Sequence, residues 1–145
     1  MAFSIRRLMP RDRARWRELF QAYIDFYNDT VAADVQEMTY SRLVAGQELV
    51  GLVAVGADDH PFGLANLVFH PATWTATGHC YLEDLYVEPA HQGRGAGRLL
   101  IEASFAEADR RGADRTYWFT RGDNVQARRL YEKLATLSPF VQYRR

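Results

Sequence analysis

Alternating apolar and polar positions predict an antiparallel sheet in the first half of the chain. Residues 3–7 alternate well enough for a short edge strand. Three later stretches, 48–55, 62–70 and 79–87, read as strands joined by turn-rich segments that contain Gly, Pro, Asp and Thr. Since consecutive strands joined by short turns run in opposite directions, these four stretches indicate an antiparallel meander.

Helical spacing of apolar side chains predicts two helices between the first two strands. Asp12 is placed to cap a helix whose apolar positions recur every three or four residues as far as Tyr27. The polar stretch 28–36 predicts a loop. A short helix over 38–45 follows, and Gly46 ends it.

The second half of the chain has a different order of elements. Residues 95–111 predict a helix with one apolar face, followed by a strand over 115–120. Because a crossover helix joins parallel strands, we expect 115–120 to run parallel to 79–87. A last helix, capped by Asp123 or Asn124, extends to about Leu134, and residues 139–144 predict a closing strand. The predicted fold class is therefore α/β, with a mixed sheet.

Length and composition favour one soluble domain. The chain has 145 residues, of which 48% are hydrophobic, and it contains no repeat or linker that would divide it. We expect a single domain over residues 1–145. No apolar run approaches the roughly 20 residues of a membrane span, and the N-terminus lacks a signal core, so we expect a cytoplasmic protein. The single cysteine, Cys80, excludes an internal disulfide, and we expect no metal site.

The net charge of zero conceals a segregation of charge along the chain. Residues 1–17 carry a net charge of +5, residues 18–93 carry −10 and residues 94–145 carry +5. If these segments mix in space, the charges are simply solvated or paired. Otherwise, the basic C-terminal part suits the phosphates of a cofactor and the acidic middle suits a cationic substrate. The overall pI of 6.9 and the acidic middle argue against nucleic-acid binding.

Residues 80–97 join a strand with two acids, Glu83 and Asp84, to a glycine-rich turn and then a helix. The unpaired N–H groups and the dipole of such a helix N-terminus favour an anion, which suggests a phosphorylated cofactor. A Walker A loop is excluded because Arg98 and Leu99 stand where it needs Lys and Ser or Thr, and a dinucleotide fingerprint would need glycine at 98. Glycines that merely allow a tight turn are the alternative.

Two motifs make the chain resemble a known family. Residues 92–97, Gln-Gly-Arg-Gly-Ala-Gly, match the Q/R-x-x-G-x-G/A acyl-CoA signature of the GNAT-superfamily N-acetyltransferases, and residues 124–133 resemble a second pattern there, N-x-x-A-x-x-L-Y-x-K. The segment 81–87 is most similar to the diamine and polyamine acetyltransferases and to a group that acetylates histones and small basic proteins. The resemblance implies a GNAT fold with antiparallel N-terminal strands, a splayed central strand pair and about four helices.

The resemblance also implies that acetyl-CoA is the acyl donor and coenzyme A the product. The backbone of a splayed strand would pair with the pantetheine amides, the amides of the glycine-rich turn would bind the pyrophosphate, and basic side chains would add contacts to phosphate. Glycines are expected where a Cβ would obstruct the phosphate oxygens. The implied cofactor-binding residues are Leu85, Tyr86, Val87, Gln92, Gly93, Arg94, Gly95, Ala96, Gly97, Arg98, Asn124, Arg128 and Lys133.

Acetyl transfer to an amine needs a base, because an alkylammonium with a pKa of about 10.4 is protonated at neutral pH. The resemblance favours Glu83 as this base, directly or through water, with Asp84 binding the ammonium. Neighbouring strand residues point to opposite faces, so both acids reach the acetyl group only if a bulge redirects one. The resemblance assigns Tyr131 as proton donor to the departing thiolate, a core aromatic being the alternative. We favour direct transfer in a ternary complex over an acyl-Cys80 intermediate.

The acceptor is the least determined part of the site. The resemblance makes the aromatic residues Tyr23, Phe26, Tyr27 and Trp74 and the acids Asp25, Asp29, Asp34 and Glu37 candidates for its pocket, with core packing as the alternative for the aromatics. A diamine or polyamine suits such a surface. A protein-lysine or N-terminal acetyltransferase and a non-catalytic acyl-CoA-binding module remain alternatives. Residues 139–145 suggest a possible homodimer, in which this segment pairs between subunits.

Overall fold

The structure, a computed structural model, describes residues 2–145 and contains one five-stranded mixed sheet. Strands β1 to β4 are antiparallel neighbours in chain order, and β5 runs parallel to β4 at the edge. The elements are β1 (Ser4–Arg7), the 3-10 turn η1 (Pro10–Asp12), α1 (Arg13–Phe26), α2 (Ala33–Ala45), β2 (Leu49–Val55), β3 (Pro61–Ala72), β4 (Thr75–Val87), η2 (Pro89–His91), α3 (Ala96–Arg110), β5 (Arg115–Tyr117) and α4 (Val125–Leu134). The predicted meander, the parallel crossover and the four helices are confirmed. No helix in this part of the chain is long and apolar enough to cross a membrane.

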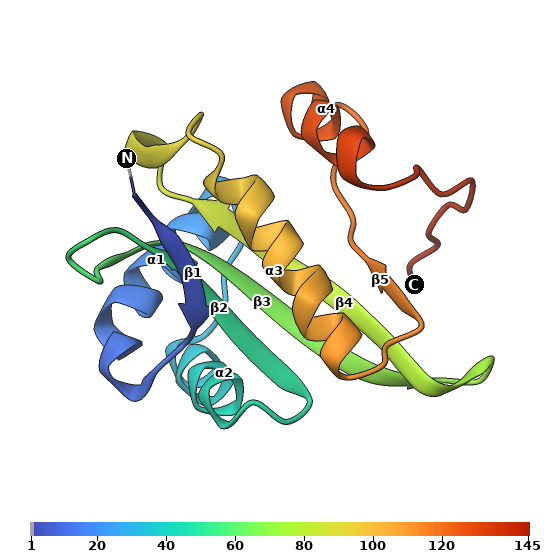
Figure 1. Cartoon of the computed structure of the whole chain (residues 1–145), viewed down its shortest axis with the longest axis horizontal. Coiled ribbons are helices and arrows are strands. Elements are labelled where there is room, and N and C mark those ends of the chain that lie inside the picture. The colour runs from blue at the N-terminus through green and yellow to red at the C-terminus, as the bar shows by residue number, and fades with distance from the viewer. Residues whose placement is uncertain (1) are drawn as a thin grey trace.

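The sheet is covered on both faces and therefore has two apolar cores. Helix α3 crosses one face, while α1 and α2 pack on the other (Figure 1). Side chains alternate along the strands between the two sides, so Leu52 lies in the α3 core and Val53 in the α1–α2 core. In β3, Ala65 lies in the α3 core and Leu64 lies in the α1–α2 core. Strands buried on both faces explain why β2 is a nearly continuous apolar run.

The start of the helical layer differs from the prediction in two places. Asp12 does not cap α1 with its side chain; its carboxylate accepts a hydrogen bond from the Met9 N–H at 2.8 Å and pairs with Arg6 at 2.8 Å. Helix α2 begins at Ala33, inside the segment predicted as a loop, and it ends as predicted before Gly46, whose φ of 70° is left-handed. The loop was predicted too long because the polar first turn of α2 has no apolar periodicity of its own.

The far end of α3 is fixed to the sheet by a buried acid. Glu107 is buried and pairs with Arg7 of β1 at 3.1 Å and with Arg111 at 3.4 Å. Arg111 also donates to the carbonyl oxygens of Gly46 and Gln47, at 2.6 and 2.5 Å. These contacts hold the C-terminal end of the helix against both β1 and the turn before β2.

Strands β4 and β5 stay paired over three residues only and then diverge. His79–Tyr81 pair with Arg115–Tyr117, and β5 ends at Tyr117 instead of the predicted Thr120. From Leu82 onward β4 has no strand on this side, and Figure 1 shows the two strands separating toward α4. The splayed strand pair that the resemblance implied is therefore present, and it opens the sheet beside the N-terminus of α3.

The predicted closing strand over 139–144 is wrong, because residues 135–145 form neither a helix nor a strand. A strand needs a neighbour for its backbone N–H and C=O groups, and the three-residue β5 supplies none over this segment. The apolar side chains that suggested the strand, Phe140, Val141 and Tyr143, are exposed.

Candidate active site

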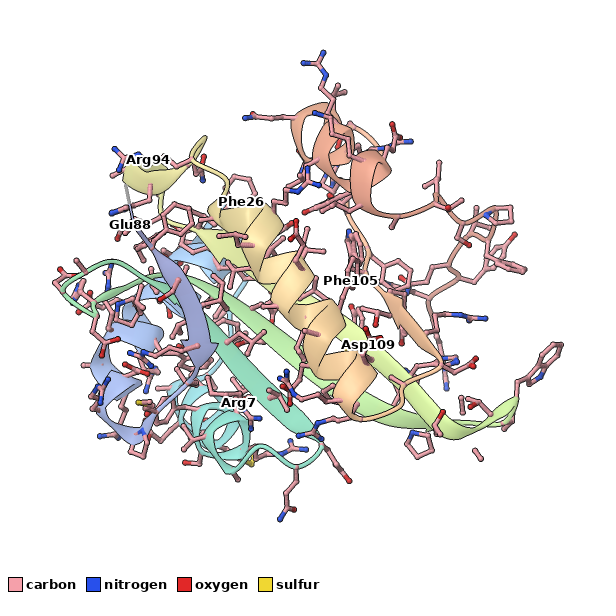
Figure 2. The ribbon with its side chains drawn as sticks, in the orientation of Figure 1. Arg7, Phe26, Glu88, Arg94, Phe105 and Asp109 are labelled. Atoms are coloured by element: carbon pink, nitrogen blue, oxygen red, sulfur yellow. The ribbon has the colours of Figure 1, made fainter. Side chains whose placement is uncertain are left out.

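The opening between β4 and β5 holds a cavity of about 700 Å³. It lies between the end of β4, the N-terminus of α3 and one face of α4, with side chains from the end of α1 on its remaining side. Figure 2 shows Glu88 and Arg94 on the segment that leads from β4 into α3. The predicted site residues that line the cavity are Tyr27, Leu85, Tyr86, Val87, Gln92, Gly93, Gly95, Ala96, Gly97, Arg98, Asn124, Tyr131 and Lys133.

The glycine-rich turn leaves an open cradle in front of α3. Gly93 and Gly95 have φ values of 78° and 89°, and a Cβ at either would meet no protein atom within 4 Å. Gly95 is the N-cap of α3, and the N–H of Leu99 makes the first intrahelical bond to its carbonyl. The amides of residues 96–98 therefore have no helical acceptor and suit a pyrophosphate.

Gly97 differs from the two glycines before it. Its φ is not left-handed, and a Cβ there would lie 3.8 Å from Leu130 Cδ2, which is an ordinary contact. Neither the backbone conformation nor the packing of the chain requires glycine at 97. A tight turn therefore explains why residues 93 and 95 are glycines, but it does not explain the glycine at 97.

The backbone of β4 presents alternate residues to the opening. Glu88 N–H donates to the Phe62 carbonyl at 2.9 Å, so by alternation Tyr86 also bonds β3, whereas Leu85 and Val87 point away from it. The Val87 carbonyl accepts a hydrogen bond from Gln92 Nε2 at 2.8 Å. The groups left to face the cavity are those of Leu85 and the N–H of Val87. This alternation favours Leu85 and Val87 over Tyr86 for the expected backbone pairing, and Tyr86 is also a lining residue of the cavity.

A β-bulge places the two acids of β4 on one face. Asn66 pairs with Asp84 and Leu67 pairs with Leu82, so Glu83 is the additional residue of β4. Leu82 and Leu85, on either side of the acids, both pack into the α3 core. Two residues between them must therefore turn toward the opposite, α1 side of the sheet. The bulge brings both carboxylates to the same face, which regular alternation would forbid.

The environments of the two carboxylates differ. Glu83 is exposed, whereas Asp84 is partly buried and accepts a hydrogen bond from Asn66 Nδ2 at 3.0 Å. Burial, with a smaller contribution from the nearby Glu83, raises the pKa of Asp84 to about 6, against the opposing effect of the hydrogen bonds from Asn66 and the Tyr23 hydroxyl, which stabilise the charged form. A carboxylate with a pKa of about 6 is ionised at neutral pH and is still able to take up a proton.

Three tyrosines gather at the cavity close to Asp84. Tyr23, Tyr27 and Tyr131 all line the cavity, and their hydroxyl groups are close enough to influence one another. Burial raises the pKa of Tyr131 above its usual value of 10, so its hydroxyl is protonated at neutral pH. Its ring also packs edge-on against Trp118, with centroids 5.5 Å apart. Tyr131 is thus a packed aromatic that also lines the cavity, and its hydroxyl carries a proton at neutral pH.

Five predicted site residues are not among those that line the cavity: the two acids Glu83 and Asp84, and Trp74, Arg94 and Arg128. Trp74 is 97% exposed, in the turn between β3 and β4, and the structure does not bring it to the site. Arg128 donates to the Gly122 carbonyl at 2.8 Å and lines a smaller, neighbouring cavity of about 140 Å³ instead. Arg94 lies on the glycine-rich turn (Figure 2) but is not among the lining residues. Trp74 was predicted because of its residue type, and the residue type does not reveal that this side chain lies exposed at the tip of a hairpin.

The two polar residues that the second motif placed in the site, Asn124 and Lys133, both line the cavity. Asn124 also caps α4, since its Oδ1 accepts a hydrogen bond from the Ala127 N–H at 3.4 Å. Arg98 lines the cavity while pairing with Glu102 at 2.7 Å. These side chains therefore have structural contacts of their own as well as positions from which to reach a ligand.

Tyr23 and Phe26, which were expected in the acceptor pocket, also line the cavity, whereas sequence reasoning left four lining residues without a role: His91, Gln126, Ala127 and Leu130. Ala127 and Leu130 occur in the second motif, and their spacing from Asn124 and Tyr131 puts all four along one side of α4. His91 stacks on Phe62 with centroids 4.2 Å apart, a contact that no local pattern predicts.

The sequence profile of the Acetyltransferase (GNAT) family matches residues 6–135, which is most of the chain. The chain belongs to the GNAT family. This GNAT acetyltransferase is 29% identical over 143 residues to the D-amino-acid N-acetyltransferase HPA3 of Saccharomyces cerevisiae, an alignment that covers 97% of this chain and 89% of the yeast protein. The diamine and polyamine subgroup is not confirmed.

Solved structures agree with the family assignment. A protein of Arthrobacter sp. FB24 described as an acetyltransferase has a TM-score of 0.79 and 28% identity, covering 97% of this chain and 94% of its own. The aminoglycoside acetyltransferase AAC(6')-Iy, solved with a bisubstrate analogue, has a TM-score of 0.83 at 18% identity, covers 100% of this chain and 99% of its own, and shares the fold. AAC(6')-Iy has also been solved with CoA. As a GNAT member, the protein is an acetyl-CoA-dependent N-acetyltransferase.

Proposed function

We propose that this acetyltransferase, one domain over residues 1–145, transfers acetyl to a small primary amine, with diamines and polyamines as the favoured class. The observation that carries this proposal is the acid pair Glu83 and Asp84, which the bulge puts on one face of β4. Within residues 2–145 neither carboxylate forms an ion pair with a cation of the chain. A cationic substrate would supply the missing positive charge.

The residues of the cavity fit acetyl-CoA, which supplies an acetyl group activated as a thioester. The open cradle at Gly93 and Gly95 would hold the pyrophosphate on the amides of 96–98, and Lys133 and Arg98 would add positive charge. The backbone of Leu85 would pair with the pantetheine arm as an additional strand does. The free N–H of Val87 would polarise the acetyl carbonyl.

The amine must lose its proton before it attacks. By the resemblance, Glu83 would accept this proton, directly or through water, and Asp84 would bind the ammonium group. The freed amine bonds to the carbonyl carbon, the carbon–sulfur bond breaks, and Tyr131 donates a proton to the departing sulfur. The nitrogen, now carrying acetyl, releases its surplus proton and so allows Tyr131 to be reprotonated. One proton reaches solvent and one stays on the thiol, which balances the reaction.

A second candidate substrate class is the D-amino acids. The supporting observation is the similarity to the yeast D-amino-acid N-acetyltransferase over 97% of this chain. An amino acid carries a carboxylate as well as an ammonium group, and a carboxylate is repelled by the acid pair. Substrates of this class would therefore bind with the carboxylate turned away from Glu83 and Asp84.

A thiol-release assay with acetyl-CoA tests these proposals. The acceptors should be matched in size and differ in charge: putrescine and spermidine, D- and L-amino acids, their methyl esters, aminoglycosides and lysine peptides. We expect the diamines and polyamines to have the highest kcat/KM, and the amino-acid esters to exceed the free acids. Preference for free D-amino acids would move the function to the second class, and selective use of peptides would indicate a protein acetyltransferase. Thermal stabilisation by acetyl-CoA without thiol release from any amine would leave only an acyl-CoA-binding module.

We also propose that the protein forms a homodimer through its C-terminal segment, residues 135–145. The segment carries exposed apolar side chains, and the outer side of β5 has no neighbouring strand in the described chain. An unpaired edge and an exposed apolar segment next to it are the features that a second copy would cover.

A further inference from the structure

Asp84 stands at the end of a buried hydrogen-bond chain that crosses three elements. Trp16 of α1 donates from Nε1 to Asn66 Oδ1 at 3.3 Å, and Asn66 of β3 donates from Nδ2 to Asp84 Oδ2 at 3.0 Å. Trp16 is completely buried and Asn66 is 3% exposed. A buried polar pair of this kind has to be satisfied by the protein, and here each member satisfies the next.

The chain has a fixed direction. The indole nitrogen of Trp16 can only donate, so it selects the oxygen of the Asn66 amide and leaves the NH₂ group for Asp84. The reversed amide would place its oxygen against the carboxylate and its NH₂ against the indole N–H, which are both repulsive. Trp16 therefore sets the orientation of Asn66, and Asn66 fixes one oxygen of Asp84.

The other surroundings of Asp84 connect it to the cavity. Tyr23 of α1, whose hydroxyl faces the Asp84 carboxylate, lines the cavity. On β4, the strand of Asp84, the neighbouring charged group is Glu83. From β3, the group that faces the Asp84 carboxylate is the Asn66 amide. Glu83, in contrast, is exposed, and no side-chain hydrogen bond from the described residues holds it. Of the two acids, only Asp84 has a defined position.

We propose that Asp84, in preference to Glu83, accepts the proton of the acceptor ammonium group, and that Asn66 and Trp16 are the positioning residues that hold its carboxylate. In this step one N–H bond of the ammonium breaks, the proton forms an O–H bond on Asp84, and the lone pair left on nitrogen attacks the acetyl carbonyl. Asp84 later returns the proton to water. The inference rests on the proposed amine acetylation at this site and changes the roles of the two acids within it.

Kinetic variants test the role of Asp84. We expect Asp84→Asn to lower kcat by roughly 10²-fold or more with an unchanged KM for acetyl-CoA. Glu83→Gln should lower kcat much less and keep the acidic limb of the pH profile. Asn66→Ala should lower kcat by less than Asp84→Asn does and should move the acidic limb to higher pH, because the hydrogen bond that positions and stabilises the charged carboxylate is lost. A loss confined to Glu83→Gln, with Asp84→Asn active, would overturn the proposal.

A second measurement does not depend on activity. We expect the indole Nε1–H signal of Trp16 in ¹H–¹⁵N NMR to shift with pH around 6, because Asp84 and Trp16 share Asn66. Asp84→Asn should abolish this titration and Glu83→Gln should preserve it. Trp74, which is 97% exposed, is the internal reference and should not follow it. A Trp16 signal that titrates unchanged in Asp84→Asn contradicts the hydrogen-bond chain.

These measurements separate the inference from the function on which it rests. A wild-type protein that releases no thiol with any amine refutes the proposed function, while the NMR titration still decides whether the chain from Trp16 to Asp84 exists. An active wild type whose acidic limb survives in Asp84→Asn refutes the inference alone. Should Asn66→Ala fail to fold, Trp16→Phe removes only the donor that orients Asn66, and it should move the acidic limb in the same direction by a smaller amount.

Discussion

Tyr131 is packed against Trp118 and also faces the cavity, so a substitution at this position can separate the two roles. Tyr131→Phe keeps the ring and removes only the hydroxyl group. We expect kcat to fall by roughly 10²-fold, because the departing thiolate loses its proton donor, and the affinity for acetyl-CoA to stay within twofold. Steady-state kinetics and calorimetric titration measure the two quantities.

Tyr117→Phe is the matched control for this prediction. It removes a hydroxyl that hydrogen-bonds to His70 at 2.7 Å, and Tyr117 does not line the larger cavity. This variant should keep its kcat. If Tyr131→Phe were as active as the control, the hydroxyl of Tyr131 would have no part in the reaction and the residue would serve packing alone.

Asp84 should make the protein less stable at neutral pH than a neutral side chain would. Its pKa is about 6 in the fold against an ordinary 3.8, so the folded state holds this proton more tightly than the unfolded chain. The free energy of unfolding therefore falls as pH rises from about 4 to 6, and above that range the loss of stability caused by Asp84 reaches its full size. Asp84→Asn should raise the free energy of unfolding at pH 7.5 by about 1–3 kcal/mol and leave it unchanged below about pH 4.

Urea unfolding at the two pH values measures this difference. Glu83→Gln, a change to an exposed side chain on the same strand, should show no comparable gain at pH 7.5. An Asp84→Asn protein that is less stable than the wild type at pH 7.5 would mean that the carboxylate is stabilised by its surroundings. A gain in stability with a loss of activity is the combination expected of a group held for chemistry.

At the scale of elements, a substitution at the start of α3 should change the stability of the protein and its affinity for acetyl-CoA in opposite directions. Gly97→Ala introduces a better helix former where the nearest protein atom is 3.8 Å from the new Cβ, so the free protein should gain up to about 1 kcal/mol. If phosphate oxygens approach this position, the same methyl group obstructs them. We expect the affinity for acetyl-CoA to fall at least about tenfold, which corresponds to about 1.4 kcal/mol.

Thermal unfolding without ligand and calorimetric titration with acetyl-CoA measure these two effects. Gly56→Ala, where the new Cβ would lie 3.5 Å from Asp58 Oδ1 and outside the cavity, is the control and should bind normally. Unchanged affinity in Gly97→Ala would show that glycine at this position serves no ligand.

The order and type of most elements could be predicted because periodicity is a local property. The bulge could not be placed in advance, although Leu82 and Leu85 contained a signal for it: apolar residues three apart cannot both face one side of a regular strand. The start of α2 and the early end of β5 depend on packing between elements. Whether residues 139–144 form a strand depends on a partner, which no local pattern specifies.

At the scale of the whole molecule, the three charged segments mix in space. Arg6 pairs with Asp59 at 2.8 Å and Arg15 pairs with Glu88 at 2.5 Å, while Arg7 pairs with Glu107 of the C-terminal segment at 3.1 Å. The basic N-terminal segment thus neutralises part of the acidic middle, which the charge sums along the sequence could not reveal. Glu83 and Asp84 are among the acids of the middle segment that remain outside the ion pairs of the described residues, as are Asp25, Asp29, Asp34 and Asp58.

The C-terminal segment leads to a prediction about assembly. Phe140, Val141 and Tyr143 are 87%, 78% and 92% exposed, and the outer edge of β5 has no strand beside it in the described chain. Burying such side chains against a second copy removes apolar surface from water and pairs a free edge. We expect the full chain to behave in light scattering as a particle of twice its 16.7 kDa mass.

Replacing Phe140 and Val141 together by Ser should give a monomer that keeps its fold, because neither side chain is buried within one copy. Val125→Ser, which changes an apolar side chain of 59% exposure on α4, is the control and should leave the dimer intact. A wild-type chain that is monomeric at tens of micromolar, or a double variant that remains dimeric, would contradict the role of this segment. If the monomer also loses amine acetylation while it still binds acetyl-CoA, the second copy contributes to the acceptor side of the site, since residues 137 and 138 line the smaller neighbouring cavity, which Tyr131 also lines.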